Sequence, residues 1–178
     1  MTSEHRRSTA NPAGNGADRI GGWIHAQSSW RERSGLDGGE ADRDSEIMRE
    51  WFEATGSVVM GRLMYDSGVE FWGGDNPPFH TLVFVLTNRP APTLVKEGGT
   101  SFTFVTDGIH SALDQAKAAA GDRNVDIAGG ADTVQQYLRA GLVDELPLHV
   151  LPGWARTPSN RSAVDTPGAT HLKYRVLK

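Results

Sequence analysis

The chain has 178 residues, of which 38% are hydrophobic, and it carries a formal net charge of -4 at pH 7. One globular domain in the cytoplasm is the expectation, because the sequence has no signal-peptide pattern and no apolar run near the roughly 20 residues that a membrane span requires. The acidic balance argues against a nucleic-acid partner, which would need clustered Lys and Arg, and the absence of cysteine excludes disulfides and thiolate chemistry.

The first part of the chain, residues 1–43, is rich in Gly, Ser, Asn, Arg and Asp and has few branched or aromatic side chains. This composition predicts a mostly disordered or irregular segment, in which only GGWIHAQSSW could dock on a core. The folded domain is predicted to span residues 44–178. It begins with a helix from Ser45 to Thr55, with Asp44 as a candidate N-cap.

Strands and helices then alternate along the chain. SVVMG is a short buried strand, RLMYDSGVEFW makes a helical turn or two, and TLVFVLT is an apolar run typical of a strand covered on both faces. SFTFVT is a further strand, SALDQAKAAAG a helix with Gly121 as its C-cap, VDIAGG a strand that ends in a turn, and DTVQQYLRAG a helix closed by Gly141. ELPLHVL and THLKYRVLK are the last two strands, and the second alternates as a half-exposed strand does.

This order of elements predicts an α/β fold, with a mainly parallel sheet flanked by helices and an antiparallel C-terminal strand pair at one edge. Ligands of open α/β sheets bind beyond the carboxyl ends of the strands. Gly129 and Gly130 lie at such an end, where glycine permits close backbone approach and the N–H groups that open the next helix can cradle a phosphate. A tight turn explains the glycine pair equally well.

Two further strand ends carry a cation. In VVMGR, Gly61 ends a strand and Arg62 begins a helix, so that Arg62 is either a phosphate ligand or a solvated surface residue. VLTNRP places three polar residues just past a strand, where they would hold an extra phosphate or form an ordinary turn: Thr87, Asn88 and Arg89. Three anion-compatible junctions at equivalent strand ends favour one anion-binding rim over three unrelated turns.

Four stretches carry a resemblance to a known family: VVMGRLMYD, LVFVLTNRP, TFVTDGIHSALDQAKAAAGDRNVDIAGGADTVQQYLRAGLVDELPLHVLP and GATHLKYRV. They resemble the dihydrofolate reductase-like superfamily. Within it they are most similar to the bacterial group related to the reductase domain of riboflavin biosynthesis, the RibD C-terminal domain. The match covers the chain from about Asp44 to Pro152 and the last strand, in the correct order.

The resemblance implies an NADPH-dependent reductase that transfers a hydride to a pteridine- or pyrimidine-type substrate, as a dihydrofolate reductase or a 5-amino-6-(5-phosphoribosylamino)uracil reductase does. By position, Gly61 and Arg62 would contact the cofactor phosphates. The adenosine 2′-phosphate would lie against Thr87, Asn88 and Arg89. The pyrophosphate would lie against the residues around the glycine pair: Gly129, Gly130, Ala131, Asp132 and Thr133.

The chain departs from the family pattern at three places. Relatives usually begin with a core strand that ends in a Ser-Leu-Asp-Gly-like turn, and no such strand is legible before residue 44. Met64 stands where a hydroxyl would help to hold phosphate. The connection GWARTPSNRSAVDTP before the last strand is shortened or replaced. These departures support an alternative, a degenerate and non-catalytic nucleotide-binding homologue.

The sequence names no catalytic acid and predicts no metal site. His149 and His171 fall on two strands that could pair, but no third ligand has metal-like spacing, so structural or solvated histidines are the favoured interpretation. A third hypothesis is an interaction module that self-associates through an exposed sheet edge. The expected partner is a small heterocyclic molecule, with a homodimer as one option and neither nucleic acid nor membrane.

Overall fold

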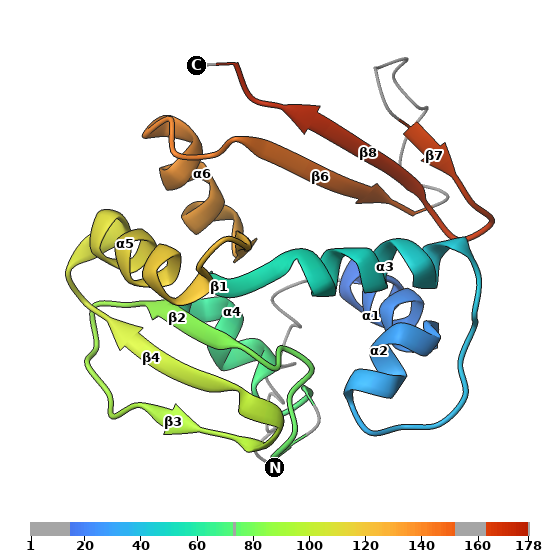
Figure 1. The fold of residues 1–178 in the computed structure, drawn as a ribbon, viewed down its shortest axis with the longest axis horizontal. Coiled ribbons are helices and arrows are strands. Elements are labelled where there is room, and N and C mark those ends of the chain that lie inside the picture. The colour runs from blue at the N-terminus through green and yellow to red at the C-terminus, as the bar shows by residue number, and fades with distance from the viewer. Residues whose placement is uncertain (1–14, 73, 152–162, 178) are drawn as a thin grey trace, which may run out of the picture.

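The computed structural model describes residues 15–72, 74–151 and 163–177. Its larger sheet has five strands in the order β3-β4-β2-β1-β5, and Figure 1 labels β3, β4, β2 and β1. The pairings of β1 with β2 and β5, and of β2 with β4, are parallel, whereas β3 joins β4 antiparallel. The mainly parallel sheet is therefore confirmed. Its strands are β1 (Thr55–Gly61), β2 (Leu82–Leu86), β3 (Leu94–Val95), β4 (Ser101–Val105) and β5 (Asn124–Gly129).

Helices flank this sheet on both faces. α5 (Gly108–Ala120) and α6 (Ala131–Arg139) pack on one face, and α4 (Arg62–Gly68) packs on the other. α5 ends at Gly121, whose positive φ of 61° suits a residue without a Cβ and confirms the predicted end of this helix.

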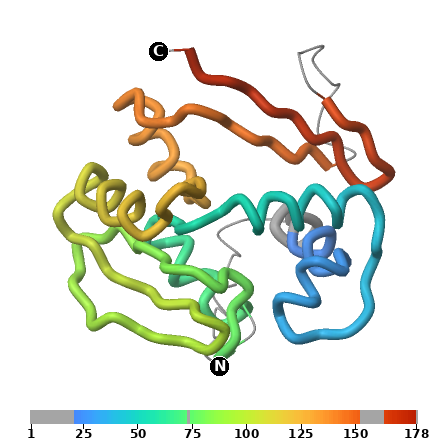
Figure 2. Tube along the Cα trace, viewed as in Figure 1, coloured from blue at the N-terminus to red at the C-terminus, as the bar shows by residue number. Residues whose placement is uncertain are grey.

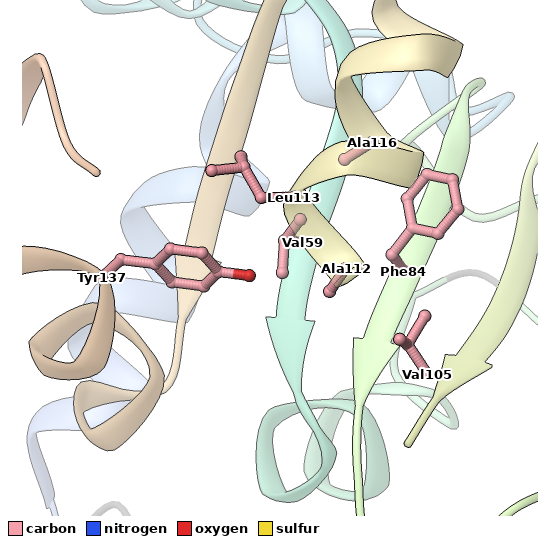
Figure 3. Packing of buried hydrophobic residues seen from close by; sticks show 7 residues of the cluster. All are labelled: Val59, Phe84, Val105, Ala112, Leu113, Ala116 and Tyr137. Atoms are coloured by element: carbon pink, nitrogen blue, oxygen red, sulfur yellow. The ribbon is translucent and has the colours of Figure 1, made fainter. Parts of the chain in front are cut away.

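The core is divided by β1, every residue of which is buried. On one face Val59 and Phe84 pack beneath Ala116 of α5, whose small side chain lets the helix lie close to the sheet (Figure 3). Tyr137 reaches this cluster from α6 and donates a hydrogen bond to the carbonyl of Ile109 at 2.8 Å. Alternate residues of the same strands build the second cluster around Tyr65 of α4.

The C-terminal strands form a second sheet, antiparallel throughout, in the order β6-β8-β7. Its strands are β6 (Glu145–Val150), β7 (Ala163–Asp165) and β8 (Thr170–Arg175). The predicted antiparallel pair is confirmed, with His149 opposite His171. It differs from the prediction in two respects: it does not border the parallel sheet, and β7 adds a third strand in a stretch predicted as a connection. Part of that connection, residues 152–162, lies outside the described residues.

The separation of the two sheets has a simple cause. Within residues 15–54 no segment forms a sheet strand, in agreement with the missing N-terminal strand that the sequence predicts. A continuous sheet would need a strand bonded to both β5 and β6, so β5 ends one sheet and β6 ends the other. Each of these edge strands leaves backbone groups without a ladder partner in the described part of the chain.

The N-terminal segment differs from its prediction. Where the sequence indicated an irregular or disordered stretch, residues 15–33 form two helices, α1 (Asn15–Ala26) and α2 (Ser28–Arg33). Hydrogen bonds hold them, and composition alone does not reveal these bonds. The Ser45 hydroxyl accepts the buried backbone N–H of Ser29 at 2.9 Å.

Arg33 is the strongest of these anchors. Its Nε donates to the carbonyl of Pro78 and its Nη2 to that of Phe79, both at 2.8 Å. The guanidinium also lies 4.6 Å from the ring centroid of Phe52, a cation–π distance. One side chain thus ties α2 to a loop 45 residues away and to the next helix.

That next helix, α3 (Arg43–Ala54), is confirmed with a shift at its start. Asp42, rather than Asp44, is the N-cap, because its carboxylate accepts the backbone N–H of Ser45 at 3.1 Å. Figure 2 shows α3 running on into β1, and no loop separates Ala54 from Thr55. No helix in the described part of the chain is long and apolar enough to cross a membrane.

One polar side chain on edge strand β5 is poorly accommodated. The Oδ2 atom of Asp126 is buried and has no hydrogen-bond partner among the described residues. Burial raises the pKa of Asp126 to about 6, although a hydrogen bond from Trp51 acts in the opposite direction. Its ionised form therefore destabilises the folded chain at neutral pH.

The Arg33 anchor can be tested by truncation. We expect Arg33→Ala to lower the free energy of unfolding by about 2 kcal/mol, because two carbonyl groups lose their charged donor and Phe52 loses its cation. Urea unfolding measures this loss. Arg31→Ala is the matched control, since within the described residues Arg31 donates to the nearby exposed carbonyl of Asp37. Equal losses in the two variants would contradict the anchoring role.

The raised pKa of buried Asp126 leads to a pH-dependent prediction. Between the ordinary carboxyl pKa and about 6, the folded state binds more protons at Asp126 than the unfolded state, so this residue's contribution to stability falls as pH rises through that window. Asp126→Asn should raise the free energy of unfolding at pH 8 by about 1–2 kcal/mol and have little effect at pH 4.5. Asp114→Asn, at an exposed position of α5, is the control. A variant that is destabilised equally at both pH values would show the interpretation to be wrong.

Candidate functional site: a rim of three strand ends

The three predicted junctions lie at one edge of the parallel sheet. Gly61, the last residue of β1, is in register with Leu86 at the end of β2. Met60 is in register with Gly129 at the end of β5. Because these strands are parallel, their carboxyl ends, and the residues that follow them, lie at the same end of the sheet. We call this edge the rim.

The first and third junctions are packed against each other. A Cβ added to Gly61 would collide with the Thr133 hydroxyl and would come within 3.5 Å of the Gly130 nitrogen. Glycine is therefore required at position 61 for close approach, since its own φ of -81° is accessible to any residue. Thr133 itself is buried at this contact.

The first and second junctions are joined by an acidic residue that the sequence analysis did not single out. Asp66 of α4 accepts a hydrogen bond from Arg62 Nε at 2.6 Å and one from Arg89 Nη2 at 3.1 Å. Arg62 also lies over the rings of Tyr65 and Phe104, at 5.6 and 5.4 Å from their centroids. The spacing of Arg62 and Asp66 by four residues on a predicted helix was the available signal for this ion pair.

The residues after β2 form a closed turn. The Thr87 hydroxyl accepts the backbone N–H of Arg89 at 3.1 Å, and Thr87 is buried. This hydroxyl is thus engaged within the chain, whereas Asn88 and Arg89 are exposed. Of the three predicted 2′-phosphate contacts, Arg89 and Asn88 are the accessible ones.

The third junction opens α6. Gly130 is its N-cap and, as a glycine, makes no side-chain cap hydrogen bond. Ala131 and Asp132 are exposed. Gly129 has φ of 127°, which favours glycine, and the peptide that joins it to Gly130 is cis. The first turn of α6 thus has no capping side chain at Gly130, as a helix N-terminus that binds an anion requires.

Met64 lies where the resemblance expected a hydroxyl. Its sulfur would stand 3.2 Å from a Cβ at Gly129, and the side chain packs on the apolar cluster around Tyr65. A thioether is a weak hydrogen-bond acceptor and cannot donate to a phosphate oxygen. The rim consequently relies on guanidinium and backbone N–H donors.

The charge of the rim is mixed. Arg62 and Arg89 supply two positive charges, and Asp66 between them supplies one negative charge. Asp132 adds a second, exposed carboxylate in the first turn of α6. An anionic ligand would therefore be attracted to the arginine pair in competition with Asp66, while Asp66 keeps the two guanidinium groups oriented.

Comparison with known proteins places this arrangement in a family. The sequence model of the RibD C-terminal domain matches residues 21–176. A candidate riboflavin biosynthesis protein from Shewanella sp. PV-4 superposes with a TM-score of 0.55 at 18% identity, over 86% of each chain, which supports the fold. A pyrimidine reductase-like protein from Corynebacterium diphtheriae is 13% identical, over 78% of this chain and 83% of that one, with a TM-score of 0.45.

No curated protein matches the chain. The family match nevertheless extends over more than half of the sequence and includes all three junctions of the rim. It also begins at residue 21, so that it takes in most of the N-terminal helical segment as well as the predicted domain. The chain belongs to the RibD C-terminal domain family, a reductase family with a dihydrofolate reductase-like fold.

Proposed function

We propose that this chain is an NADPH-dependent reductase that transfers a hydride to a pteridine- or pyrimidine-type substrate. The observation that supports this most directly is the joining of three phosphate-compatible junctions into one rim. Gly61 packs against Thr133, and Asp66 ties Arg62 to Arg89. The cytoplasm is the compartment that we propose for this activity.

The residues of the rim fit the phosphates of NADPH. Arg62 and the N–H groups that open α6 would bind the pyrophosphate, where the absence of a Cβ at Gly130 leaves its backbone accessible. Arg89, which is 71% exposed, would bind the 2′-phosphate as a planar bidentate donor. Asp66 and Met64 lower the expected affinity, since one is a competing anion and the other cannot donate.

The reduction is divided between cofactor and protein. When bound, the nicotinamide supplies the hydride. The chain contributes positioning: the rim fixes the phosphate end of the cofactor and so determines where its other end lies along the sheet. The fixed guanidinium groups also keep their orientation before the ligand arrives, which lowers the ordering cost of binding.

The second candidate is a nucleotide-binding homologue without catalysis. It is favoured by one observation: residues 15–54 provide no strand between β5 and β6, so the two sheets remain separate. The rim does not depend on that strand. Binding and turnover are therefore separable properties of this chain.

Cofactor choice gives the first test. Arg89→Gln should weaken NADPH binding about tenfold and NADH binding less than about twofold, because only NADPH carries the 2′-phosphate. Equilibrium titration followed by tryptophan fluorescence measures both affinities.

Two further variants sharpen this test. Arg62→Gln should weaken both nucleotides alike, since both contain the pyrophosphate. Arg49→Gln should change neither, because Arg49 pairs with Glu32 among the N-terminal helices. A loss in Arg89→Gln that is the same for NADPH and NADH would refute the assignment of Arg89 to the 2′-phosphate.

Turnover gives the second test. We expect NADPH to be oxidised, with loss of its absorbance, when dihydrofolate or an aminopyrimidine is added to the purified chain. Binding without oxidation would favour the non-catalytic homologue. Absence of nucleotide binding, together with self-association in analytical ultracentrifugation, would instead support the interaction module.

A further inference from the structure

A hydrogen-bonded row of three titratable side chains, two of them buried, lies outside the rim. Asp44 Oδ1 is 2.7 Å from His171 Nε2, and His171 Nδ1 is 2.7 Å from His149 Nδ1. Asp44 Oδ2 also accepts the indole N–H of Trp23 at 3.0 Å. Asp44 and His171 are 1% and 7% exposed, whereas His149 is exposed. These three side chains thus connect a buried carboxylate to an exposed imidazole.

These side chains come from four different elements. Trp23 belongs to α1, Asp44 to α3, His171 to β8 and His149 to β6. The Trp23 ring also lies over both imidazoles, with centroid distances of 5.7 Å to His149 and 6.0 Å to His171. The cluster therefore fastens the separate C-terminal sheet to the N-terminal helices.

The geometry of these three side chains limits how they can be protonated. Burial disfavours ionised Asp44, but hydrogen bonds from Thr166, Trp23 and His171 outweigh burial and lower its pKa. The Asp44 carboxylate then accepts a hydrogen bond from the N–H at His171 Nε2, which leaves His171 Nδ1 to face His149 Nδ1. Two nitrogens at 2.7 Å need one hydrogen between them, so one imidazole must donate and the other must accept.

This contact can take up one excess proton but not two. With none, His149 donates to His171; with one, the charged ring donates to the neutral one. With a second proton, both facing nitrogens would carry a hydrogen and neither could accept. Two positively charged rings would then be in contact. Burial, followed by repulsion from His171, already lowers the pKa of His149, against an opposing effect of Asp44.

Other charged side chains on the neighbouring strands have partners of their own. Two residues along β8 from His171, Lys173 forms an ion pair with Glu145 of β6 at 2.6 Å. On β7, Asp165 accepts the hydroxyl of Thr170 at 2.7 Å. Trp23 of α1 carries no ionisable group. Asp44 is thus the carboxylate in direct contact with the imidazole pair, and the pair itself determines the response to acid.

We propose that Asp44, His171 and His149 form a pH-responsive latch, which holds the C-terminal sheet on the N-terminal helices at neutral pH and opens in mild acid. Because the folded state binds fewer protons at His149 than the unfolded state below the ordinary histidine pKa, the latch loses stabilising energy as pH falls below about 6.5. Opening expels His149 first, since its ring already faces solvent.

NMR of the wild-type chain tests the proposal without any substitution. The ring nitrogens of His149 and His171 should titrate in two coupled steps separated by more than about one pH unit. Exposed His110 of α5, outside this cluster, serves as the internal reference. The indole N–H resonance of Trp23 should shift during the second step. Independent, uncoupled titration of the two rings would overturn the latch.

Variants test the consequence for the sheet. Between pH 7.5 and 5, hydrogen-exchange protection of the amides in β6 and β8, corrected for intrinsic exchange, should fall at least about tenfold in the wild type. In His149→Gln, which cannot hold a second proton, it should fall less than about twofold. His110→Gln should behave as the wild type. If His149→Gln loses the same protection as the wild type, the proposal fails.

A second variant covers the case in which His149→Gln does not fold. Asp44→Asn retains the shape of the side chain but removes the charge that favours an imidazolium. Both titration steps should then move to lower pH, by about one unit. Unchanged midpoints would overturn the proposal.

Discussion

Complete burial of β1 between parallel neighbours is the constraint on which the described structure depends. With no exposed residue, this strand must be covered on both faces and paired on both sides, and the helices α4, α5 and α6 and the strands β2 and β5 meet that demand. Parallel pairing then brings three strand ends to one edge. The rim is thus a by-product of core packing. Its chemistry is determined by the few residues just beyond each strand, above all Arg62, Arg89 and the glycine pair.

The order and type of the main elements after residue 44 were predictable, because apolar runs, helix-forming stretches and glycine stops such as Gly121 are local signals. The gathering of the three junctions followed from the general rule for parallel strands. The ion pairs of Asp66 with Arg62 and Arg89 could not be predicted in this way, since an acidic residue on a helix surface has many candidate partners in sequence. The closed turn at Thr87 could not be predicted either. There, a hydroxyl expected to contact a ligand bonds to the backbone of the chain instead.

The N-terminal segment shows why composition misled the prediction there. Gly, Ser and Arg indicate disorder when nothing buries them, yet Ser29 and Arg33 bond to groups that lie far along the chain. Such long-range partners are invisible to periodicity. The same holds for Asp44, which looks like an ordinary helix cap in sequence, while Asp42 has that role and Asp44 turns inward to His171. The separate position of the second sheet was also hidden, since strand pairing does not reveal which edges remain open.

The strands of the described fold are divided into two separate hydrogen-bond ladders. No described ladder bond of β6, β7 or β8 belongs to the sheet of β1, β2, β4 and β5, so fraying of the C-terminal strands breaks no ladder bond of the parallel strands. Subglobal opening of this kind has a lower free energy than global unfolding. A chain built in this way can exchange order and disorder at one end while the arginine pair at the other keeps its geometry.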